Sequence, residues 1–178
     1  MKYFHEHTRA LAIPFWLALL LVLCGTLASF APANAAGCSV SSSGMAFGSY
    51  QPLHFPGKSP SPALTTDASV SLVCTAIEGG GSFTLGLGPS SIGPGDRIST
   101  RYLANYSGGD NMEFNVYTNA TYSIIWGDGT AGSVMGGSIA AGDSTQILTV
   151  YGRIPAGQNM LRTGAFTGIL TVTLTYNP

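Results

Sequence analysis

The chain has 178 residues, which is enough for one domain and an export segment but too few for two full β-sandwiches. Only 8% of the residues are charged and the formal net charge is -1, so the chain lacks the clustered Lys and Arg of a nucleic-acid-binding protein. Hydrophobic residues make up 45%, which argues against an intrinsically disordered chain. The 24 glycines and the scarcity of charge indicate an all-β, exported protein.

Residues 1–36 are predicted to be a secretory signal peptide that is removed on export. Lys2 and Arg9 give a positive start, and 11–23 is an uncharged apolar run. The small-x-small pattern at 33–35 is what a signal peptidase requires. We therefore expect the protein to pass through the periplasm and to reach the cell surface or the medium.

Two alternatives to a cleaved signal remain open. The first is an uncleaved membrane anchor, because 10–30 is uncharged and nearly long enough to span a bilayer. The second is lipid attachment at Cys38, which follows a glycine.

Export changes the cysteine count in an informative way. Cys24 leaves with the signal, so Cys38 and Cys74 remain as a pair. In an oxidising compartment two remaining cysteines most simply form a disulfide with each other. Two free thiols are the alternative.

The mature chain has strand patterns and turn signals but no helical periodicity. The clearest early row is Ala68, Val70, Leu72 and Cys74, which alternate with polar residues. Strands are predicted at 38–43, 68–75, 83–87, 114–118, 122–126, 148–150 and 169–176. Glycine-rich and polar turns are predicted at 79–81, 88–95, 107–111 and 131–137, and a proline-rich connection at 51–62. Seven or eight short strands favour an antiparallel sandwich or barrel in residues 37–178.

Catalytic patterns are missing from the mature sequence. His54 is its one histidine, and no G-x-S-x-G motif occurs. An exported hydrolase would have to use Asp128, Asp143, Glu113 or His54, which lie far apart in the sequence. Asp128 is compatible with either a calcium ligand or a turn residue. We therefore expect no enzyme activity, no cofactor, no metal and no small-molecule substrate.

The final strand predicts an unfinished sheet. Leu170, Val172, Leu174 and Tyr176 share one face, and the chain stops where an immunoglobulin-like sandwich has one more strand. An exposed apolar cleft and an unpaired edge would follow, which is an aggregation hazard. We therefore predict an incomplete immunoglobulin-like antiparallel β-sandwich in which these four residues form the strand that receives a donor strand or a chaperone strand.

Several short motifs carry a family resemblance over 37–178. They are Cys38, FGSY at 47–50, Cys74, FNVY at 114–117, WGDG at 126–129 and VYGRIPAGQ at 150–158. With these motifs the chain resembles the spore coat protein U domain, which secreted spore coat protein U shares with the subunits of archaic chaperone–usher pili. Phe166 and Gly168 depart from the family, which more usually has Tyr and Asp there.

The resemblance implies an exported structural subunit of a surface fibre or coat. A periplasmic chaperone would lend a strand, an outer-membrane usher would receive the subunit, and a neighbouring fibre subunit would then donate its own strand. Cleavage after residue 35 leaves only Ala36 and Gly37 before Cys38, so the subunit would accept a strand but not give one. The subunit would then stand at a fibre end, with a part in cell adhesion and biofilm, or it would form a coat that does not polymerise.

A free-standing secreted lectin-like binding module is the alternative function. It would hold a sugar or a surface on exposed aromatic residues. The candidates are Trp126, Tyr102, Tyr106, Tyr117, Tyr122 and Tyr151.

Overall fold

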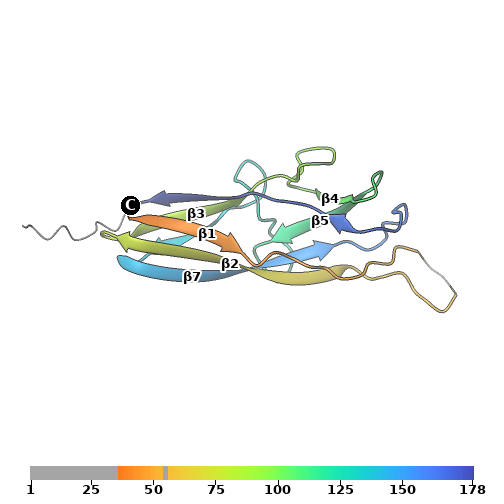
Figure 1. The fold of residues 1–178 in the computed structure, drawn as a ribbon, viewed down its shortest axis with the longest axis horizontal. Helices are drawn as coiled ribbons and strands as arrows, with labels where there is room; N and C mark the ends of the chain where they lie inside the picture. The colour runs from red at the N-terminus through yellow and green to blue at the C-terminus, as the bar shows by residue number, and fades with distance from the viewer. Residues whose placement is uncertain (1–35, 54–55) are drawn as a thin grey trace, which may run out of the picture. The chain divides into compact units, whose positions relative to one another are not determined.

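The computed structural model describes residues 36–53 and 56–178, so the predicted signal peptide and His54 lie outside the described residues. Among the described residues the structure contains strands and turns but no helix, and therefore no helix that could span a membrane. The strands are β1 (Gly37–Ser42), β2 (Leu64–Ile77), β3 (Gly81–Leu87), β4 (Arg101–Asn105), β5 (Asn111–Tyr117), β6 (Met135–Ile139), β7 (Gly142–Ile154), β8 (Phe166–Thr167) and β9 (Val172–Asn177) (Figure 1).

Two antiparallel sheets of unequal size pack together as a sandwich. The larger has six strands in the order β1-β2-β7-β5-β4-β8, and the smaller has three in the order β6-β3-β9. The predicted all-β sandwich is confirmed. Because the smaller sheet has half as many strands, part of the inner face of the larger sheet needs another cover.

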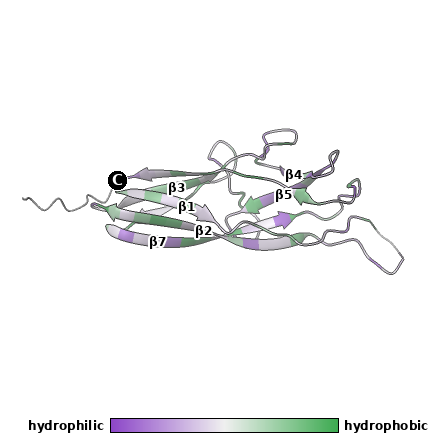
Figure 2. Ribbon diagram, viewed as in Figure 1, coloured by the Kyte–Doolittle hydropathy of each residue, from purple (hydrophilic) through white to green (hydrophobic). Residues whose placement is uncertain are grey.

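The predicted inward row on β2 forms the centre of the core. Ala68, Val70, Leu72 and Cys74 are all at most 6% exposed. Phe83, Leu85 and Leu87 of β3 are buried in the same core cluster. Hydrophobic bands on β2 and β5 are visible in Figure 2. The period of two therefore decides which face of each strand is buried.

A disulfide joins the first two strands. Cys38 and Cys74 are directly opposite in the antiparallel register of β1 and β2, and their sulfur atoms are bonded. The pairing expected from the cysteine count is confirmed. The bond fixes the edge strand β1 to its neighbour β2.

We expect the Cys38→Ala/Cys74→Ala protein to lose about 3 kcal/mol of its free energy of unfolding, because the disulfide constrains the unfolded chain across 36 residues. Urea denaturation of the oxidised wild type and of the variant measures this loss. Wild type reduced with a thiol is the matched control and should show the same loss. Equal midpoints for oxidised and reduced wild type would contradict the prediction.

The predicted strand at 122–126 is wrong. The segment forms only isolated bridges, which pair Tyr117 with Ile125 and Trp126 with Ser133. The Asn119 side chain holds the loop instead, since its Oδ1 accepts hydrogen bonds from the Ser123 and Ile124 amides at 3.1 and 3.2 Å. Local side-chain bonds of this kind compete with a sheet ladder.

Three observed strands were not predicted, and the last strand begins later than predicted. β4 was missed, and β6 lies partly in the predicted turn at 131–137. Gly137 suits β6 because a Cβ there would lie 2.9 Å from the Phe83 ring. The short strand β8 was also missed, and the predicted strand at 169–176 begins only at Val172, after the chain has passed from β8 in the larger sheet to β9 in the smaller one.

Arg101 of β4 ties the two sheets together from inside the core. It is 0% exposed, and its guanidinium donates to the carbonyls of Leu87, Gly88 and Trp126 at 2.8–3.1 Å and to Asn115 Oδ1 at 2.7 Å. Burial lowers the pKa of Arg101 to about 10, which leaves it charged at neutral pH. All three guanidinium nitrogens donate to neutral oxygen atoms.

Candidate functional site

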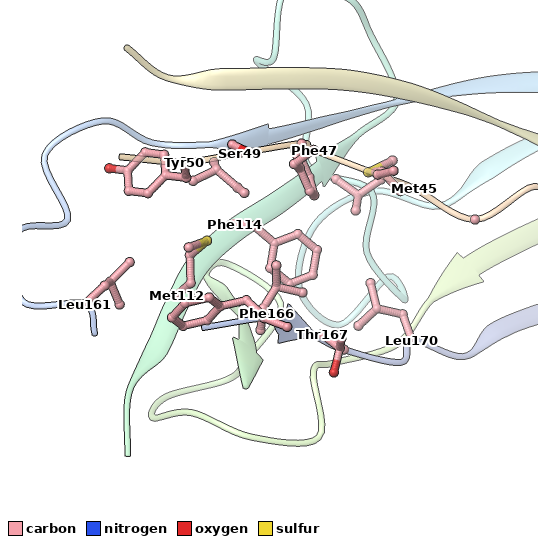
Figure 3. Close-up of a pocket in the computed structure, with 18 of the residues that line it drawn as sticks. Met45, Phe47, Ser49, Tyr50, Met112, Phe114, Leu161, Phe166, Thr167 and Leu170 are labelled. Atoms are coloured by element: carbon pink, nitrogen blue, oxygen red, sulfur yellow. The ribbon is translucent and has the colours of Figure 1, made fainter. Parts of the chain in front are cut away.

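An apolar cleft of about 1000 Å³ opens between two segments without long strands. Segment 44–50, which follows β1, forms one wall, and segment 161–170, which precedes β9, forms the other (Figure 3). Met112 and Phe114 of β5 lie between the walls. The cleft therefore lies over the inner face of the larger sheet, where the smaller sheet gives no cover.

The cleft is lined mostly by apolar groups. Arg162 is the one charged residue among the described residues that line it, and its backbone amide bonds Asp110 Oδ2 at 2.6 Å. The described lining includes no His, Cys, Asp or Glu, so it offers no acid–base pair. The larger apolar lining side chains are Met45, Phe47, Met112, Phe114, Leu161, Phe166, Leu170 and Val172. Such a lining can bind by apolar contact.

Two sheet edges end beside the cleft. Among the described strands, β8 pairs only with β4, and β9 pairs only with β3. Phe166 and Thr167 of β8 and Val172 of β9 line the cleft. A strand edge presents main-chain N–H and C=O groups that are free to pair with another chain. The cleft thus combines apolar pockets with unfinished hydrogen-bond ladders.

The structure divides the four residues predicted for a partner strand into two pairs. Leu170 and Val172 line the cleft. Leu174 and Tyr176 lie outside the cleft lining, opposite Leu85 and Phe83 of β3, where they are half-buried against the core. The Tyr176 hydroxyl donates to the Gly80 carbonyl at 3.1 Å. The cleft therefore begins beside β9 and continues toward residues earlier in the chain.

Most of the cleft was not predicted from the sequence. The unpredicted part includes the wall at 44–50 and most of the wall at 161–170. Met45 and Phe47 alternate with exposed neighbours, as in a strand, but only two apolar positions repeat. Leu161 and Phe166 stand in a segment rich in glycine and polar residues. Met112 lies two residues before Phe114, the first residue of the predicted strand at 114–118. Because alternate residues of a strand face the same side, this spacing was the one signal in the sequence that could have predicted that Met112 is buried.

The acidic candidates for a hydrolase or a calcium site serve local structure. Asp128 Oδ1 accepts hydrogen bonds from the Thr130 hydroxyl and from the Thr130 and Ala131 amides, and these bonds lower the pKa of Asp128. Asp143 Oδ1 accepts from the Ala76 amide at 2.9 Å. No group of three or more Cys, His, Asp or Glu residues suited to a metal ion is found in the described part of the chain.

The aromatic candidates for a lectin-like surface do not form a single patch. Trp126 is 2% exposed, and its Nε1 donates to the Leu85 carbonyl at 2.8 Å. Tyr122 packs edge-on against both Tyr117 and Tyr151, with ring centroids 5.7 and 6.4 Å apart. Tyr106 is 86% exposed. The largest aromatic candidate is therefore part of the core.

Three comparisons with known proteins bear on the family of this chain. The chain is similar, at 14% identity and a TM-score of 0.47, to a crystal structure of the CsuC–CsuE chaperone–tip adhesion subunit pre-assembly complex from archaic chaperone–usher Csu pili of Acinetobacter baumannii. The match covers 79% of this chain and 40% of that chain, so this chain spans about two fifths of its length. A comparison with curated proteins gave no match. A family model of the Spore Coat Protein U domain matches residues 25–173, and the chain therefore belongs to the Spore Coat Protein U domain family.

Proposed function

We propose that the protein is an exported structural subunit of a chaperone–usher-type surface fibre or coat, and that its cleft accepts an extended strand from another molecule. One observation carries this proposal. An apolar cleft of about 1000 Å³ lies beside the unpaired edges of β8 and β9. An inserted strand would bond to these edges and place alternate side chains in the apolar lining.

The size of the apolar contribution supports a strand as the ligand. Burying four or five apolar side chains would contribute roughly 8–12 kcal/mol before the cost of ordering the strand. That contribution is comparable to the whole stability of a domain, about 5–15 kcal/mol. A subunit with the cleft empty is therefore expected to be far less stable than the complex, and to need a chaperone until a permanent partner arrives.

Family membership supports the remaining parts of the proposal. In transit, a periplasmic chaperone fills the cleft, an outer-membrane usher receives the subunit, and a neighbouring subunit then supplies the permanent strand. Cleavage of the signal after residue 35 would leave no donor segment before Cys38, and the subunit would then either stand at a fibre end or form a coat that does not polymerise by strand donation. N-terminal sequencing of the exported protein tests this placement, and cleavage before residue 26 would contradict it.

A structural role, and not an enzymatic one, agrees with the lining of the cleft. Its larger described side chains are mostly apolar, and the carboxylates of Asp128 and Asp143 are engaged in local hydrogen bonds. A strand-accepting subunit needs only this apolar contact and the two free edges.

A pair of neighbouring substitutions tests the proposal. Leu170 lines the cleft, whereas Ile169 is 86% exposed. Wild type exported alone should be recovered in low yield because most of it aggregates or is degraded, and it should be recovered in far higher yield as a 1:1 complex when the periplasmic chaperone of the same organism is co-expressed. Leu170→Asp should reduce the yield of this complex at least about tenfold, because a charge in the apolar cleft costs well over 1.4 kcal/mol.

Ile169→Asp is the matched control and should leave the yield of the complex unchanged. A yield of soluble wild-type monomer without the chaperone that equals the yield of the complex with it would contradict the proposal. That result would favour a free-standing binding module.

A further inference from the structure

Segment 44–50 is a wall of the cleft that is not part of a sheet. Main-chain hydrogen bonds bracket it, from the Ser43 amide to the Ser69 carbonyl at 3.0 Å and from the Ser61 amide to the Gln51 carbonyl at 2.8 Å. Between them, the main chain of residues 45–50 makes no hydrogen bond to any other described residue. A segment without a ladder is held only by its side chains and is easily displaced.

The side chains that hold this segment enter the sandwich. Met45 and Phe47 are half-buried and lie over Gly152 of β7, where a Cβ would overlap Met45 Sδ and lie 2.8 Å from the Phe47 ring. The Phe47 ring packs edge-on against Phe114, with centroids 6.1 Å apart. Gly152 therefore leaves the space that the two side chains fill.

The far end of the segment is fixed by a tyrosine hydroxyl. The Tyr50 hydroxyl donates to the Pro155 carbonyl and accepts from the Gln158 amide, both at 3.1 Å. The segment is thus attached at both ends, by the strand β1 before it and by Tyr50 after it. The part between, which holds Met45 and Phe47, is the part free to shift.

Met45 and Phe47 cover the same sheet face as the cleft. Val150, Gly152 and Ile154 are successive inward positions of β7, and the first and last of them line the cleft. Met45 and Phe47 occupy the position between, over Gly152. Figure 3 shows both side chains facing the cleft from the wall opposite Phe166 and Leu170.

We infer that segment 44–50 is a displaceable plug, which fills part of the strand-binding cleft until a partner strand enters. On binding, Met45 and Phe47 leave Gly152, and apolar side chains of the incoming strand replace them. This inference rests on the proposed function and adds its regulation. The plug shields apolar surface in the free subunit and restricts the cleft to strands that bind well enough to displace two side chains.

Methionine oxidation in the wild-type protein tests the inference, with a synthetic peptide of about twelve alternating Val and Thr residues as the strand. Hydrogen peroxide converts accessible methionines to sulfoxides, which mass spectrometry locates. When the peptide binds, Met45 should oxidise several-fold faster and Met112, on the floor of the cleft, several-fold more slowly. Met160, which is 91% exposed, is the internal control and should not change.

Slower oxidation of both Met45 and Met112 on peptide binding would overturn the inference. In that case segment 44–50 stays in place as a fixed wall, and the bound peptide covers Met45 together with Met112. The same result would leave the proposed function intact, since the peptide has bound.

The peptide affinity of two variants gives an independent test, because the inference predicts that both bind the peptide more tightly than wild type. Met45→Ala/Phe47→Ala removes the side chains that must be displaced, so it should bind the peptide about tenfold more tightly than wild type. Gly152→Ala keeps the plug sequence but fills its seat, and should also bind more tightly. Weaker binding by both variants would identify a fixed wall and overturn the inference. Failure of wild type and both variants to bind the peptide would overturn the inference and the proposed function together.

Discussion

The Arg101→Met protein is expected to lose about 3–5 kcal/mol of its free energy of unfolding. Methionine can fill much of the same space, but it cannot donate to the acceptors that surround Arg101. The Leu87 and Trp126 carbonyls and Asn115 Oδ1 would lose their guanidinium partner inside the core. The connection from β4 to the end of β3 would be lost with them. Urea denaturation followed by circular dichroism measures the loss.

Arg101→Lys separates charge from geometry. A lysine keeps the positive charge but has one ammonium group, which cannot reach acceptors that surround a planar guanidinium. We expect it to lose more than half as much stability as Arg101→Met. Arg153→Met is the surface control, because Arg153 is exposed and lies 5.7 Å from the Tyr122 ring centroid, and its loss should be below about 1 kcal/mol.

The loss caused by Arg101→Met should not depend on pH near neutrality. Burial lowers the pKa of Arg101 to about 10 in the folded protein, below its ordinary value in the unfolded chain, so both states are protonated at neutral pH. Above a pH of about 10 the unfolded state binds more protons, and stability from this group rises with pH. Equal stabilities of wild type and Arg101→Met between about pH 6 and about pH 8 would contradict a structural role for this arginine.

The parts of the fold that could be predicted from sequence are those with a repeated period. On β2, alternation over Ala68, Val70, Leu72 and Cys74 determines which face is buried, and β1 and β3 follow the same pattern. The cysteine pair is predictable because only Cys38 and Cys74 remain after the expected cleavage. Each of these predictions rests on a pattern within the sequence itself, either a repeated alternation of apolar residues or a single possible pair of cysteines.

The unpredicted parts depend on single long-range contacts. β4 begins with Arg101, a residue type that is rarely buried, and the acceptors that stabilise it come from β3, β5 and the segment at Trp126. The plug is positioned by Gly152, more than 100 residues away in the sequence. Periodicity within one segment contains no information about such partners, so most of the cleft could not be placed from the sequence.

A strand appended after Pro178 is expected to raise the melting temperature by about 10–15 °C. A short Asn-Gly turn would return the chain antiparallel to β9, and about ten to twelve alternating Val and Thr residues would reach from Asn177 back to Leu170 and the cleft. The gain comes from apolar side chains in the cleft and main-chain bonds along β9, offset by the cost of ordering the added residues. Thermal unfolding of the exported, disulfide-bonded protein measures the effect.

The control separates strand insertion from the mere presence of a longer chain. A second extension of equal length, with the same turn but Ser in place of every Val, keeps the hydrogen-bonding main chain and loses the apolar side chains. If the cleft selects by apolar burial, this extension should raise the melting temperature by less than about 3 °C. Equal rises for both extensions would show that the edge of β9 alone binds the strand. No rise for either would mean that the sandwich is already complete, and that a partner strand has nothing to finish.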